Sequence, residues 1–128
     1  MKFAKVVFRA AAVYGFIVIA PMYFMESMIG ATSPPAITHP EHFYGFIGVT
    51  LAWQVAFLII AQRPDRYRPL MLAAIAEKAG FGVAGVVLFL QQRAVASVLA
   101  FSLIDLLLGS LFVAAYAVTP PFDPTQPR

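Results

Sequence analysis

Four polar side chains lie within long apolar stretches of the sequence, and they carry most of the chemistry available to this chain. Glu77 and Lys78 are adjacent, while Gln54 and Asp105 lie near the middle of two other stretches. An ionised side chain at the centre of a bilayer costs about 2.5–3.5 kcal/mol, so such groups are expected to face inward and find partners. At a rise of about 1.5 Å per residue, Gln54, Lys78 and Asp105 fall within roughly one helical turn of the same depth.

The first interpretation of these groups is structural. Neighbouring residues on a helix point about 100° apart, so Glu77 and Lys78 are expected to face different helices. Lys78 would then pair with Asp105 across a tight helical hairpin, and Glu77 would pair with Arg9 from the first apolar stretch. Two such ion pairs would fix the register of the helices.

The second interpretation is a ligand or proton site at mid-depth. Glu77 and Asp105 would be its acid and base if the protein were an enzyme, because carboxylates are common proton-transfer groups. Lys78, Gln54 and Trp53 would complete the ligand-binding set. Opposite charges satisfy each other, so the structural interpretation is favoured, and both stay open.

A second polar group, Glu26, His39, Glu41 and His42, lies near the opposite end of the same stretches. The His-x-x-His spacing can bring two imidazoles together, and carboxylates and imidazoles are both metal ligands. A metal or a porphyrin axial ligand is therefore conceivable, with His42 favoured over His39 because His39 precedes a proline. The alternative is that these side chains are polar residues at the level of the lipid headgroups.

The composition indicates what must hold these groups. Of 128 residues, 61% are hydrophobic and 12% are charged, whereas soluble domains carry about 25% charged residues. Four apolar stretches, at about 6–28, 43–61, 70–90 and 95–118, approach the roughly 20 residues that span a bilayer. Lipid cannot satisfy backbone polar groups, so these stretches are expected to be helices. We predict one all-α domain over 1–128, an integral membrane four-helix bundle that runs up-down-up-down.

Proline and charge mark the limits of these helices. Pro21 is expected to kink the first helix. Pro40 is expected to open the second, with Thr38 and Glu41 as a capping box. The short link 91–93 predicts antiparallel neighbours for the third and fourth helices. The tail, 119–128, holds four prolines and is expected to be irregular.

Cations gather at one end of the predicted bundle, which gives an orientation. They are Lys2, Lys5, Arg9, Arg63, Arg66, Arg68 and Arg128. The opposite end has Arg93 alone, so the positive-inside rule places both termini in the cytoplasm of a bacterial inner membrane. Arg63, Arg66 and Arg68 are expected to contact anionic headgroups or an acidic partner.

Small residues recur at helical spacing and predict close helix contacts. One stripe holds Gly45, Gly48, Ala52 and Ala56. The other holds Ala73, Ala76 or Glu77, Gly80 and Ala84, with Gly82 and Gly85 on a neighbouring face. Each stripe is expected to pack within the bundle, or else to dock another copy or another membrane subunit.

Several classes of function find no support in the sequence. The chain has no cysteine, so thiol and zinc-thiolate chemistry are excluded. It has no phosphate-binding loop, zinc-protease or hydrolase motif, and no cofactor is implied by motif. The net charge of +3 does not indicate nucleic acid, because the cations lie where a membrane protein keeps them.

We therefore predict a small non-catalytic membrane protein that serves as an accessory or structural subunit of a larger inner-membrane assembly. Its partners would be lipids and other membrane subunits or further copies of itself. An alternative is a small enzyme or binder for a lipophilic ligand such as a quinone, isoprenoid or sterol-like compound. A dimeric small exporter is the weaker alternative, because the first helix carries its carboxylate, Glu26, at the outer end rather than at mid-depth.

Overall fold

The computed structural model describes residues 1–126, and this part of the chain is helical without strands. The last proline of the tail and Arg128, counted above among the cytoplasmic cations, lie outside the described residues. The helices are α1 (Lys2–Ile19), the 3-10 helix η1 (Ala20–Phe24), α2 (Glu26–Thr32), α3 (Pro40–Gln62), α4 (Arg68–Leu90) and α5 (Ala96–Val118).

Four segments are long and apolar enough to cross a bilayer. They are Lys2–Phe24, Pro40–Gln62, Arg68–Leu90 and Ala96–Val118, each of 23 residues. A helix of that length spans about 34 Å, which exceeds a hydrocarbon core of about 30 Å. The chain is therefore a small integral membrane protein with an all-α, four-helix bundle fold, as predicted.

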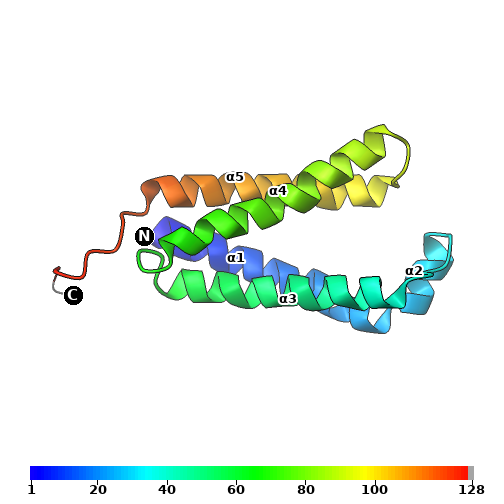
Figure 1. Cartoon of the computed structure of the whole chain (residues 1–128), viewed down its shortest axis with the longest axis horizontal. Coiled ribbons are helices and arrows are strands. Elements are labelled where there is room, and N and C mark those ends of the chain that lie inside the picture. Colours follow the sequence, from blue (N-terminus) through cyan, green and yellow to red (C-terminus); the bar gives the residue numbers. More distant parts are fainter. Residues whose placement is uncertain (127–128) are drawn as a thin grey trace.

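The bundle consists of two antiparallel helix pairs, α1 with α3 and α4 with α5 (Figure 1). Both termini and the turn between α3 and α4 lie at one end, where the two pairs come together. Toward the opposite end, which carries α2, the pairs diverge. The chain thus forms a closed half and an open half.

Three aromatic rings fill the closed half. Phe8 of α1 stacks on Phe112 of α5 with ring centroids 4.2 Å apart, and Phe57 of α3 meets Phe112 edge-on at 5.0 Å. All three side chains are fully buried, and small residues such as Ala11 and Ala74 surround them. Aromatic pairs in these geometries attract each other beyond simple burial, so this cluster links three of the four spans.

Glycines set how closely the helices approach. A side chain added at Gly85 of α4 would overlap the Ser102 hydroxyl of α5, and one added at Gly82 would come within 2.7 Å of Leu106. At Gly15 of α1, an added side chain would overlap Gln54 of α3. In lipid the hydrophobic effect does not drive helices together, so van der Waals contacts between closely approaching backbones hold them instead.

The stripe of small residues on α4 was expected to pack within the bundle, but it faces outward. Its members are all exposed: Ala73, Ala76, Gly80 and Ala84. The prediction that this stripe packs inside the bundle is therefore wrong for α4. Gly82 and Gly85 lie on the neighbouring face of α4, where they leave room for the side chains of Leu106 and Ser102 of α5. This face of α4, and not the stripe, therefore contacts α5.

The first and second helices begin and end differently from the prediction. The first span starts at Lys2 and changes from α to 3-10 geometry at Ala20, so the single helix over 6–28 is not formed. Pro21 lies in the first turn of η1, where a residue without an N–H is tolerated. His39, not Thr38, is the residue that precedes the first turn of α3, so the expected capping box is absent from this described turn.

The glycine contacts lead to a test of the α4–α5 interface. Gly85→Val would force a branched side chain into Ser102, and overpacking of this kind costs about 1–3 kcal/mol. Gly80→Val is the matched control on the same helix, because a Cβ added there would meet no described atom within 4 Å beyond its chain neighbours and the backbone of its own helix. Unfolding by dodecyl sulfate in mixed micelles, followed by circular dichroism, measures both, and equal destabilisation would contradict the proposed contact.

Candidate ligand-binding cleft

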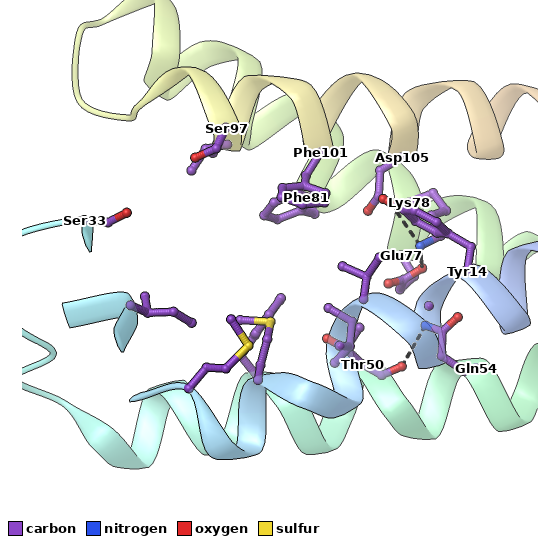
Figure 2. Close-up of a pocket in the computed structure, with 18 of the residues that line it drawn as sticks. Tyr14, Ser33, Thr50, Gln54, Glu77, Lys78, Phe81, Ser97, Phe101 and Asp105 are labelled. Atoms are coloured by element: carbon purple, nitrogen blue, oxygen red, sulfur yellow. Dashed lines mark hydrogen bonds and ion pairs between the residues drawn. The ribbon is translucent and has the colours of Figure 1, made fainter. Parts of the chain in front are cut away.

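A cleft of about 490 Å³ lies between the two helix pairs in the open half of the bundle (Figure 2). Ligand sites in proteins range over about 300–1,000 Å³, so this cleft is large enough for a small molecule. Its lining changes along its length. At mid-depth the floor is polar and is formed by Tyr14, Gln54, Glu77, Lys78 and Asp105.

Lys78 connects the two carboxylates of the floor. Its Nζ atom donates a hydrogen bond to Asp105 Oδ1 at 3.2 Å and lies 3.6 Å from Glu77 Oε2. The three side chains are only 5%, 17% and 13% exposed for Lys78, Glu77 and Asp105 respectively. Two carboxylates therefore share one ammonium in a largely buried position. The predicted pairing of Lys78 with Asp105 is present.

The predicted pairing of Glu77 with Arg9 is wrong. Arg9 is exposed on α1, and Glu77 contacts its own neighbour Lys78 instead. Glu77 and Lys78 leave the helix about 100° apart, which is why they were expected to face different helices. A lysine stem is long and flexible, so its ammonium can turn back toward an adjacent residue.

Gln54 contributes an amide to the floor from α3. Its Nε2 donates to the carbonyl oxygen of Thr50 at 2.9 Å, and the side chain lies over Gly15 of α1. Its Oε1 atom is buried and accepts no hydrogen bond from the described residues, and the same holds for Glu77 Oε2. A buried acceptor without a donor costs about 1–3 kcal/mol. Glu77 Oε2 keeps an ion-pair contact with the Lys78 ammonium, whereas Gln54 Oε1 has no described donor at all.

The walls of the cleft are apolar and lead from the floor toward the divergent end. Met22 and Met25 line one side, and Phe46, Phe81 and Phe101 line the others. Methionine side chains are flexible and adapt to irregular shapes. These wall residues could not be predicted from the sequence, because an apolar side chain at a cleft has the same pattern as one that faces lipid.

Trp53 does not line the cleft, contrary to the prediction. It adjoins Gln54, but the two side chains point about 100° apart on the helix. The Trp53 ring packs beside Phe57, with centroids 6.2 Å apart, against the aromatic core.

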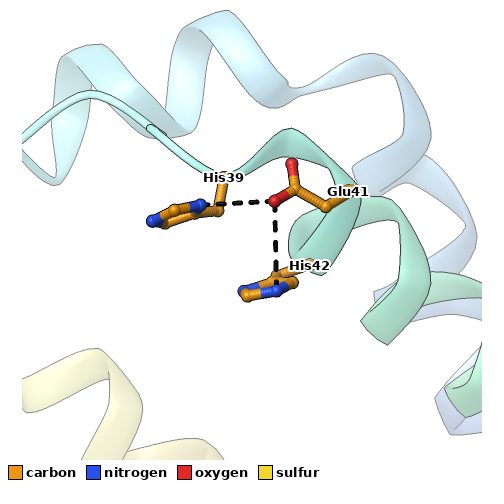
Figure 3. A group of neighbouring side chains, drawn as sticks. All are labelled: His39, Glu41 and His42. Carbon is orange, nitrogen blue, oxygen red and sulfur yellow. Dashed lines mark hydrogen bonds and ion pairs between the residues drawn. The ribbon is translucent and has the colours of Figure 1, made fainter.

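The histidine cluster forms a separate, exposed group at the N-terminal end of α3 (Figure 3). His39 Nδ1 lies 3.2 Å and His42 Nε2 lies 3.9 Å from the same Glu41 oxygen. The three ligand atoms lie within 4.8 Å of one another, as a metal site would need. Glu26 is not part of this group, because it accepts a hydrogen bond from Tyr44 at 2.8 Å. A metal or porphyrin at His39 and His42 stays a prediction.

The three arginines of the α3–α4 turn have different environments. Arg63 pairs with Asp65 at 3.4 Å, while Arg66 is exposed. Burial raises the pKa of Asp65, but hydrogen bonds from Arg63 and from backbone N–H groups outweigh it, so the pKa lies below its usual value. Arg66 is thus the arginine of this turn that is most accessible to a headgroup or a partner.

Arg68 stabilises the end of α5. Its Nε donates to the carbonyl oxygen of Thr119 at 2.7 Å, and its guanidinium lies 3.7 Å from the centre of the Tyr116 ring. A cation at a helix C-terminus is favoured by the orphan carbonyls and the helix dipole. These contacts give Arg68 a structural role, and its predicted contact with headgroups or a partner stays a prediction.

Comparison of the chain with protein-family models, curated proteins and solved structures gave no match. The function is therefore inferred from the chemistry of the cleft itself.

The shared ammonium leads to a stability prediction. Lys78→Met leaves Glu77 and Asp105 buried without their cation, and breaking a buried ion pair in this way costs about 3 kcal/mol. Arg9→Met removes an exposed cation and is expected to change stability by less than about 0.5 kcal/mol. Unfolding in mixed micelles measures both variants. Equal stability of the Lys78→Met and Arg9→Met proteins would show that the floor does not depend on this ammonium.

Proposed function

We propose that this protein binds an amphiphilic small molecule in the cleft. The observation that carries the proposal is the polarity gradient of the lining. Polar groups gather at the floor, and methionine and phenylalanine side chains form the walls toward the divergent end. An apolar pocket with a few convergent polar groups is typical of small-molecule sites. The apolar body of the ligand would lie between the helix pairs and its polar head on the floor.

Binding is favoured over catalysis by the contacts at the floor. The two acid–base candidates, Glu77 and Asp105, both contact Lys78. An ion network of this kind can hold and orient a head group without a chemical step. A quinone is a weaker candidate than a donor-bearing molecule, because its carbonyls accept hydrogen bonds and the free atoms of Gln54 and Glu77 also accept them.

A cleft-filling variant tests the proposed function. Val18 lines the cleft, whereas its neighbour Ile17 is 68% exposed on the outer face of the same helix. Val18→Trp is expected to lower occupancy by amphiphiles roughly tenfold or more, equivalent to about 1.4 kcal/mol of binding free energy. Native mass spectrometry of protein released from micelles counts the bound molecules.

Ile17→Trp is the matched control, since it adds the same ring at nearly the same depth but toward lipid. Its occupancy should equal that of the unchanged protein. Equal occupancy in the Val18→Trp and Ile17→Trp proteins would mean that amphiphiles bind elsewhere on the surface, and the cleft would lose its assigned role.

A second candidate function is that of an accessory subunit in a larger membrane assembly. The exposed stripe of Ala73, Ala76, Gly80 and Ala84 on α4 supports it, because small residues on a lipid-facing surface permit close approach of another helix. This function is compatible with ligand binding, since the stripe and the cleft use different residues.

Whether a partner helix packs on the α4 stripe can be tested with a substitution that the four-helix bundle itself should tolerate. Gly80→Val adds a side chain in open space, and Gly45→Val does the same on α3. If a partner helix packs on the α4 stripe, Gly80→Val should remove the partner during purification in mild detergent, and Gly45→Val should retain it. Retention of the same partner by the Gly80→Val protein would refute this docking face.

We also propose an orientation. The N-terminus, the turn with Arg63 and Arg66, and the start of the tail lie at the closed end (Figure 1). The positive-inside rule supports a cytoplasmic position for that end in a bacterial inner membrane. The cleft would then open toward the outer half of the bilayer.

A further inference from the structure

We infer that the ligand of the cleft carries a cationic head with N–H donors, that is, a lipophilic amine or guanidine. This inference rests on the proposed function and assigns the chemical class of the bound molecule. Its basis is the balance of charge and of hydrogen-bonding groups at the floor.

The charges at the floor do not cancel. Glu77 and Asp105 supply two carboxylates, and Lys78 is the only lysine or arginine among the described residues that line the cleft. All three side chains are largely buried. An uncompensated charge in a low-dielectric site is costly, and a second cation removes that cost. An ammonium or guanidinium head supplies the missing charge.

The hydrogen-bonding groups show the same imbalance. Gln54 Oε1 and Glu77 Oε2 are buried acceptors that receive no hydrogen bond from residues 1–126. The ammonium of Lys78 already donates to Asp105 and lies against Glu77. The Tyr14 hydroxyl also lines the cleft, yet no described donor reaches these two oxygens. N–H groups on a bound molecule can supply the missing bonds, and on a charged head they bond more strongly to carboxylates than neutral donors do.

Aromatic rings adjoin the floor on the side of the cleft mouth. Phe81 of α4 and Phe101 of α5 lie between the charged floor and the more distant Ser97 and Ser33 (Figure 2). The face of an aromatic ring attracts a cation. A positively charged head that enters past these rings would meet favourable groups before it reaches the carboxylates. An anionic head would meet two carboxylates and an ammonium that is already engaged.

Three probes with the same alkyl chain separate the possible heads. Dodecylamine supplies a cationic donor, dodecanol a neutral donor and dodecanoate an anionic acceptor. Each is added to the purified full chain in nonionic micelles, and native mass spectrometry gives its occupancy. We expect dodecylamine to bind roughly tenfold more tightly than dodecanol, as one added charge-assisted contact would give. Dodecanoate is expected to bind most weakly.

A paired substitution shows whether the floor causes this ranking. Glu77→Gln keeps the shape of the side chain and removes one negative charge, so the preference for amine over alcohol should fall to about twofold or less. Glu41→Gln is the matched control, because Glu41 is exposed and lies outside the cleft lining. It should leave the preference unchanged. The ranking in the unchanged protein is informative even if Glu77→Gln does not fold.

The outcomes separate the two claims. If dodecanol or dodecanoate binds as tightly as dodecylamine and Val18→Trp still blocks binding, the cationic head is refuted and the cleft remains a ligand site. The same refutation follows if Glu77→Gln retains the full preference for the amine. If Val18→Trp leaves the occupancy of every probe unchanged, the proposed function itself is wrong.

Discussion

Close helix packing is the interaction on which the rest of this structure depends. Lipid is as apolar as the helix surfaces, so burial of leucine or valine gives the four spans little reason to associate. What holds them is shape. Phe8, Phe57 and Phe112 interlock at one end, and Gly82 and Gly85 admit α5 into contact with α4. Where the aromatic contacts between the two helix pairs stop, the pairs separate.

The polar floor lies at this boundary between contact and separation. Gly109 of α5 faces the Cβ of Lys78, and a side chain added there would come within 3.3 Å of it. The packed half of the bundle thus positions the base of the lysine, while its ammonium reaches Asp105 at the edge of the cleft. The charges gain partners from the packed half and remain accessible from the open half.

Features that depend on the length of an apolar stretch or on a residue's depth in it could be predicted from the sequence. The direction in which a side chain points around its helix could not. The four spans and the meeting of Lys78 with Asp105 follow from counting residues along each stretch. Counting residues does not show that Gly80 faces outward and Gly85 faces α5. Both residues are small, and the helix that carries them is apolar nearly all round. Trp53 and Arg9 were misplaced for the same reason. The roles of Gln54, Glu77 and Asp105 as ligand contacts stay predictions.

One wall of the open half is formed by the segment around Pro21. Pro21 lies where α1 gives way to η1, and Met22 and Met25 beyond it belong to the cleft lining. A 3-10 turn rises further per residue than an α-helix and presents its side chains in different directions. Beyond Ile19, α3 packs against η1 rather than against a continued α1. The charged groups at the base of the same cleft, Glu77, Lys78 and Asp105, come from the α4–α5 pair, so both helix pairs contribute to its lining.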